Sequence, residues 1–93
     1  MDLNIKIEED DIAWEESSYV AVIQSSKNCI TIDANKNGLI SLAKQLLSLA
    51  YSENSSFYIH HWPEAHGKDY YGYGDLEEGS VELVVVKNNK KGR

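Results

Sequence analysis

Only one segment of this 93-residue chain has the hydrophobic pattern of an amphipathic helix. Between residues 39 and 50, apolar side chains recur three and four positions apart, which predicts a helix of about four turns with one wide apolar stripe. Residues 33–35 offer a short polar side chain to cap its first amides, and the turn-forming residues 53–56 end it. The stripe consists of Leu39, Leu42, Ala43, Leu46, Leu47 and Ala50. With a single helix available, the rest of the core must come from strands.

The remaining patterned segments alternate with the period of two that is typical of strands. Residues 3–7 alternate apolar and polar side chains, residues 19–24 are apolar on both faces, and residues 29–34 alternate again after a turn. Two further strands are predicted at residues 57–62 and 81–86, giving the order β-β-β-α-β-β. We therefore expect an α+β domain, with a five-stranded antiparallel or mixed sheet and the helix on one face. Residues 19–24 and 29–34 should pair as a hairpin.

One helix cannot cover both faces of such a sheet. If Phe57 and Ile59 point toward the helix, the pleat turns Tyr58, His60 and Trp62 to the open side. Aromatic side chains are enriched where partner proteins dock, so this row predicts a binding surface. The alternative is that the loop after the strand folds back over Tyr58 and Trp62 as a local lid.

That loop, residues 63–79, holds three tyrosines, five carboxylates and four glycines. Structureless connections longer than about 12–15 residues are uncommon in compact domains and tend to be functional or disordered. We predict that its tyrosines extend the aromatic row as partner anchors, with acidic residues around them. The loop residues assigned to this surface are Asp69, Tyr70, Tyr71, Tyr73, Asp75, Glu77 and Glu78.

Charge is unevenly distributed along the chain. Residues 1–86 contain all 15 carboxylates and only five lysines, a net charge of −10, and the basic last seven residues bring the total to −6. A negatively charged protein repels phosphate backbones and attracts basic proteins, so we expect a protein partner and no nucleic acid. The alternative is that the charge serves only solubility. We expect residues 1–87 to form a single domain and residues 88–93 a disordered basic tail.

The sequence also indicates the cellular compartment of the protein. Cys29 is the only cysteine, which excludes an internal disulfide and argues against a secreted disulfide scaffold. The N-terminus has no signal-peptide pattern, and no apolar run approaches the length of a membrane span. We therefore expect a cytoplasmic protein that does not enter a membrane.

Metal binding and catalysis have weaker support. His60, His61 and His66 with Glu64 and Asp69 are ligand types that zinc accepts, but neighbouring strand residues such as His60 and His61 point to opposite faces. The sequence contains no nucleophile elbow and no dinucleotide fingerprint. We predict neither an enzyme nor a cofactor.

From the helix onward, the chain resembles the immunity protein 32 family of bacterial polymorphic toxin systems. The resemblance spans roughly residues 28–86 and does not include the first 27. It is carried by Gly38-Leu39, Leu42-Ala43, Leu46-Leu47, Leu49-Ala50, His60 or His61, Gly79-Ser80 and Glu82-Leu83. The resemblance implies a cytoplasmic antidote that binds a cognate toxin domain, which could be a basic one, and it brings no established contact residues. Two alternatives remain: a homo-oligomeric module, such as a homodimer, and a metal- or small-ligand-binding domain.

Overall fold

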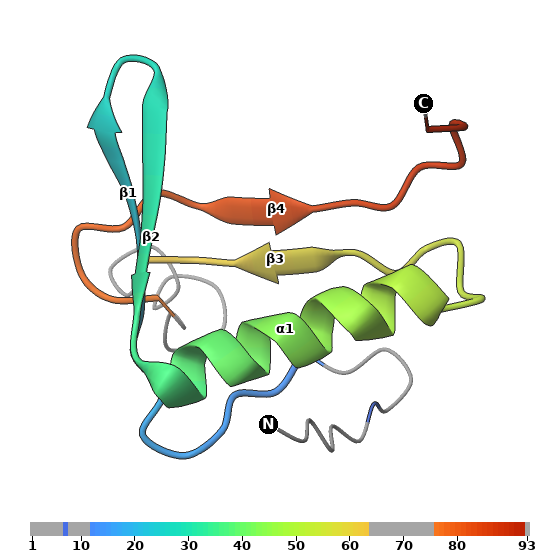
Figure 1. The fold of residues 1–93 in the computed structure, drawn as a ribbon, viewed down its shortest axis with the longest axis horizontal. Coiled ribbons are helices and arrows are strands. Elements are labelled where there is room, and N and C mark those ends of the chain that lie inside the picture. The colour runs from blue at the N-terminus through green and yellow to red at the C-terminus, as the bar shows by residue number, and fades with distance from the viewer. Residues whose placement is uncertain (1–6, 8–11, 64–75, 93) are drawn as a thin grey trace.

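The computed structural model describes residue 7, residues 12–63 and residues 76–92. Within this part of the chain, one helix is combined with four strands in two separate antiparallel sheets of two strands each (Figure 1). The elements, in chain order, are β1 (Val20–Ser26), β2 (Cys29–Ala34), α1 (Lys36–Tyr51), β3 (Ile59–His61) and β4 (Leu83–Val85). The α+β class agrees with the sequence prediction.

The predicted five-stranded sheet is wrong. β1 pairs with β2 and β3 pairs with β4, with no continuous ladder between the two pairs. The segment that leads into β4 contacts β1 only locally. The amide of Val81 donates to the carbonyl of Val22 at 2.7 Å, and the amide of Val22 donates to the hydroxyl of Ser80 at 3.0 Å. A side-chain hydroxyl thus accepts the hydrogen bond that a neighbouring strand's carbonyl would accept in a ladder. Gly79, at a φ of +88°, turns the chain just before this contact.

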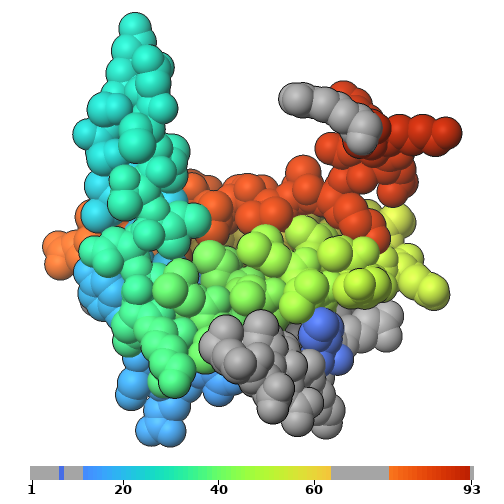
Figure 2. Space-filling view, viewed as in Figure 1, coloured from blue at the N-terminus to red at the C-terminus, as the bar shows by residue number. Residues whose placement is uncertain are grey.

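The predicted first strand, residues 3–7, lies outside the described residues except for Ile7, which is exposed and in no strand. The hairpin prediction is confirmed, since β1 and β2 are antiparallel with Val20 opposite Ala34. Its base is buried at residues 20–22, whereas residues 23–33 are exposed. Figure 2 shows the hairpin rising from the body at the upper left, so its far half cannot contribute to the core.

The helix begins and ends with identifiable caps. Asn35 is the N-cap predicted from residues 33–35: its Oδ1 accepts from the amides of Gly38 at 2.8 Å and Tyr19 at 3.0 Å. At the other end the last turn has no basic residue of its own, and Lys87 approaches instead. Its Nζ donates to the carbonyls of Ala50 at 3.2 Å and Ser52 at 2.8 Å. A cation at a helix C-terminus stabilises the exposed carbonyls and the helix dipole.

The helix buries a different face from the one predicted. Leu39 and Leu46 of the predicted apolar stripe are 52% and 42% exposed, and only Leu42 of that stripe is buried. The face turned inward is largely small or polar and consists of Gly38, Ser41, Leu42, Gln45, Ser48 and Leu49. These positions also recur three and four residues apart, so periodicity alone could not choose between the two faces.

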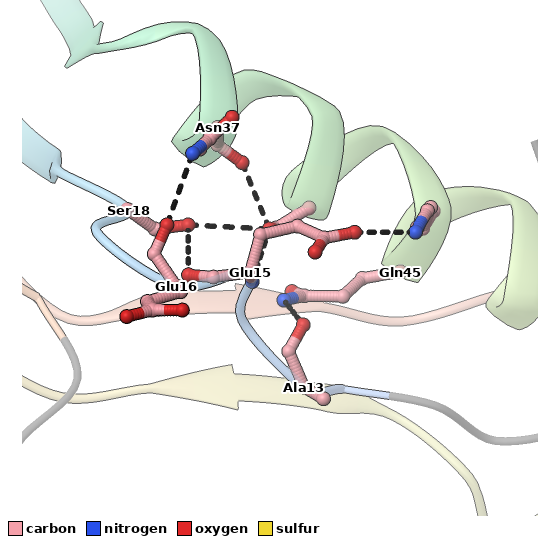
Figure 3. Close-up of polar contacts among 8 residues, drawn as sticks. Ala13, Glu15, Glu16, Ser18, Asn37 and Gln45 are labelled. Atoms are coloured by element: carbon pink, nitrogen blue, oxygen red, sulfur yellow. Dashed lines mark hydrogen bonds and ion pairs between the residues drawn. The ribbon is translucent and has the colours of Figure 1, made fainter.

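Hydrogen bonds to residues 12–18 explain why this polar face is inside (Figure 3). The Ser41 hydroxyl accepts from the amide of Glu15 at 2.7 Å and donates to a carbonyl of its own helix. The Gln45 side chain donates to the carbonyls of Ile12 and Ala13, and Asn37 donates to the carbonyl of Glu16. Burial of polar groups costs little when each is paired in this way.

The apolar core is small. Val20, Val22 and Leu76 form its buried cluster, with three partly buried side chains packed against it: Trp14, Ala34 and Leu83. Gly38 brings the helix close to the start of β1, since a Cβ there would lie 2.3 Å from the carbonyl oxygen of Tyr19 and 2.7 Å from a methyl group of Val20. In the described part of the chain, no helix combines the length and the hydropathy needed to cross a bilayer.

Candidate partner-binding surface

The two faces of β3 differ as the strand pattern predicts. Ile59 and His61 are fully buried on the face turned to the helix, where Nε2 of His61 lies 2.5 Å from Oε1 of Gln45. Tyr58, His60 and Trp62 alternate with them and remain partly or largely exposed. Because successive side chains of a strand point to opposite faces, and His61 meets the helix, these three side chains lie on the face turned away from it. We call this surface, which also includes Glu82 and Val84 of the β4 segment, the open face.

The three rings of the open face form a row. The centroids of His60 and Trp62 are 3.9 Å apart with planes inclined by 27°, a stacked arrangement. The centroids of Tyr58 and His60 are 6.2 Å apart with the planes tilted. Contacts between neighbouring rings restrict the rotamers of each, which lowers the entropy lost when a partner binds.

Beside this row is an open pocket with a volume of about 350 Å³. Its described lining consists of Ile12, Tyr58, His60 and Trp62. Ile12 comes from the segment that Gln45 holds against the helix, so the pocket combines residues far apart in the sequence. Such a concave, mostly apolar site is suited to receiving one side chain of a partner.

The residue just before β4 supplies a carboxylate to this surface. Val84 lies directly opposite His60 in the register, and alternation puts Glu82 on the same face. Oε2 of Glu82 lies 2.8 Å from Nε2 of His60, a contact in which the imidazole donates and the carboxylate accepts. Sequence reasoning missed both Glu82 and Ile12. The alternation of residues 81–86 could have indicated Glu82, whereas no pattern in the sequence indicates Ile12.

The opposite directions of His60 and His61 agree with the argument against a shared metal ion. His60 contacts Glu82 on the open face, while His61 is buried against Gln45 and the ring of Trp14, whose centroid is 4.6 Å away. Among residues 7, 12–63 and 76–92, no group of three or more His, Cys, Asp or Glu side chains is placed to hold a metal ion.

The loop residues predicted for this surface are only partly described. Glu77 is half-buried and Glu78 exposed, and they follow Leu76, whose amide donates to the carbonyl of Trp62 at 2.9 Å. The amide of Glu77 itself donates to the carbonyl of Val20. The backbone at residues 76 and 77 therefore lies between the end of β3 and the base of the hairpin. The other five predicted positions lie outside the described residues: Asp69, Tyr70, Tyr71, Tyr73 and Asp75.

A second set of apolar side chains is exposed on the hairpin. Ile23, Ile30 and Ile32 are each more than a third exposed, the largest value being 56% for Ile30. They lack the rings and the carboxylate of the open face. They provide a useful comparison, because they offer similar apolar area on the other sheet.

Comparison with protein-family models matches residues 30–88 to the family described as immunity protein 32. This range includes all of α1, β3 and β4 and covers more than half of the chain. Searches of curated proteins and of solved structures found no match. The family suspected from the sequence is thus confirmed.

Proposed function

This chain belongs to the immunity protein 32 family, and we propose that it binds the toxin domain of its own bacterial toxin system and neutralises it in the cytoplasm. The family match is the observation that carries this proposal. Inhibition by binding requires a surface and no turnover, in keeping with an immunity role for a small domain.

We assign toxin binding to the open face. Tyr58 and Val84 are 52% and 51% exposed, and the stacked pair of His60 and Trp62 follows Tyr58 on the same face. Interfaces are strongest where a few aromatic side chains fill pockets, with polar groups at the rim. The open face combines both features, because Glu82 lies beside the rings.

The charge of the whole chain favours a basic toxin domain. At a net charge of −6, the protein attracts a basic partner over distances of about one Debye length, roughly 8 Å at physiological salt. Such steering raises the association rate more than the affinity, so its contribution should weaken as salt is added.

The test begins with a search for a toxin domain in the reading frames that adjoin this gene. Its affinity for the native protein and for the Tyr58→Ala and Trp62→Ala variants can be measured by isothermal titration calorimetry. Truncating an aromatic anchor at the centre of an interface costs about 2 kcal/mol, so we expect each variant to bind about 30-fold more weakly. Rescue of cells that express the toxin should decline in parallel.

Ile30→Ala and Ile32→Ala are matched controls, because they remove exposed apolar side chains from the other sheet. They should bind the toxin within about twofold of the native protein, since changes outside a hot spot cost little. Circular dichroism should show that all four variants are folded. Undiminished binding by folded Tyr58 and Trp62 variants, or a loss confined to the hairpin variants, would refute the assignment.

Self-association through the same face is the second candidate, and the exposed Tyr58, Val84 and Val86 side chains favour it. Sedimentation velocity at low micromolar concentration distinguishes the two. A monomer that forms a one-to-one complex with the toxin supports inhibition. A dimer that Trp62→Ala converts to a monomer would show that the open face pairs with itself.

A further inference from the structure

The pocket on the open face has walls suited to a flat, cationic group. Tyr58 and Trp62 line it together with His60, whose ring is stacked on Trp62. The face of an aromatic ring carries partial negative charge and attracts cations, with tryptophan the most effective. The fourth described lining residue, Ile12, is apolar and suits the methylene stem of a long side chain.

A carboxylate lies beside one wall of this pocket. Glu82 contacts the lining residue His60 at 2.8 Å, and its side chain is 45% exposed. An apolar side chain entering the pocket would remove water from the surroundings of this charge and add no attraction to it, which is unfavourable. A cation would gain attraction from both the rings and the carboxylate.

We propose that the pocket receives an arginine side chain of the partner protein. This inference rests on the proposed function and specifies what the open face recognises. A guanidinium is planar, stacks on aromatic rings and is more weakly hydrated than the ammonium group of lysine, so arginine is favoured over lysine. The volume of about 350 Å³ is at the lower end for ligand sites and leaves room for an arginine side chain. The net charge of −6 is complementary to a basic partner.

A pair of short peptides tests the inference without the toxin. Acetyl-Gly-Arg-Gly-amide and its citrulline counterpart have nearly the same shape, but citrulline is uncharged. Each is titrated into the full-length protein at pH 8 and constant ionic strength, and binding is followed by shifts of backbone amide and indole signals in NMR spectra. We expect the arginine peptide to bind at least about fivefold more tightly, with the largest shifts at Tyr58, His60 and Trp62.

Two charge variants separate a specific pocket from general attraction. Glu82→Gln removes the carboxylate's charge and keeps an oxygen that can accept from His60, so the preference for arginine should fall below about twofold. Asp33→Asn removes one exposed charge from β2 and should retain the preference. Tyr58→Leu, at an exposed position, should weaken binding of the arginine peptide at least about threefold in a protein that remains folded.

Equal affinity for the two peptides, or equal losses in Glu82→Gln and Asp33→Asn, would overturn the inference. These results are independent of the toxin measurement. One outcome is that the pocket shows no preference for arginine, but the Tyr58→Ala and Trp62→Ala variants bind the toxin more weakly than the native protein. In that case the proposed function stands and the arginine pocket fails. If the pocket prefers arginine but toxin binding does not change in these variants, the assignment of the toxin to the open face fails instead.

Discussion

Replacement of Gln45 by leucine is the sharpest test of the polar contacts that hold the helix. The Gln45 side chain is fully buried, and its Nε2 donates to the carbonyls of Ile12 and Ala13 at 3.3 and 3.1 Å. Because the amide nitrogen donates to these carbonyls, Oε1 is left to accept from Nε2 of His61, which must therefore carry a hydrogen. Leucine has a similar volume and can make none of these bonds.

The expected loss follows from the burial of each partner. His61 is fully buried, and an unpaired buried donor costs about 1–3 kcal/mol. Ile12 and Ala13 are exposed residues whose carbonyls can bind water, so losing their hydrogen bonds costs about 1 kcal/mol in total. The added apolar surface of leucine offsets about 1 kcal/mol. We expect Gln45→Leu to lower the free energy of unfolding by about 2 kcal/mol, a large share of the usual 5–15 kcal/mol.

Urea denaturation followed by tryptophan fluorescence measures this loss, since the ring of Trp14 packs against His61. Lys44→Met is the control, since Lys44 is on the same helix as Gln45. It removes the partly exposed ion pair of Lys44 with Glu15, a contact worth about 0–1 kcal/mol. His61→Leu should be destabilising by itself. The double variant should be at least about 1 kcal/mol more stable than the sum of the single losses predicts, because no unpaired donor remains. A neutral Gln45→Leu variant, or strictly additive losses, would refute the reasoning.

Two further stability predictions concern the ends of the helix. In an open helix interior, Gly38→Ala would raise the free energy of unfolding by about 1 kcal/mol. Here the new Cβ would lie 2.3 Å from the carbonyl oxygen of Tyr19, so we expect urea denaturation to show a net decrease of about 1–3 kcal/mol. A stabilised variant would contradict the close approach. Lys87→Met should lose about 1 kcal/mol, because the Lys87 ammonium binds the carbonyls of Ala50 and Ser52. Lys90→Met, at an exposed position, should lose less than about 0.5 kcal/mol, and equal losses for the two lysines would show that the capping contact contributes nothing.

Local patterns in the sequence were sufficient for the hairpin, the helix and its cap. β1 and β2 follow directly from two strand-like runs around a turn, and Asn35 is one of the three residues predicted to supply the cap. The alternation of residues 57–62 also predicted correctly which side chains of β3 are buried and which form the open face. In each case the signal and the structure lie within about 15 residues of each other, so no long-range contact could override the local preference.

The helix face and the division into two sheets depend on partners distant in the sequence. The leucines of one stripe predicted that this face of the helix is buried. Ser41 and Gln45 are buried instead, because backbone groups of residues 12–18 form hydrogen bonds with them. Backbone donors and acceptors are present at every position and leave no mark in the residue pattern. Likewise, the turn at Gly79 and the bond from the Val22 amide to the Ser80 hydroxyl interrupt what would be a strand ladder beside β1, which alternation cannot reveal.

The polar helix face also determines where the open face lies. An apolar stripe packs with little directional preference, whereas the bond between Gln45 and His61 joins one position of α1 to one position of β3. His60 and Trp62, the residues on either side of His61, point the other way and form the stacked pair. Gln45 contacts His61 of β3 and the backbone carbonyl of Ile12. We infer that this one side chain positions both β3 and Ile12, which line two sides of the same pocket. The shape of the pocket thus depends on the hydrogen bond between Gln45 and His61, which is buried beneath the open face.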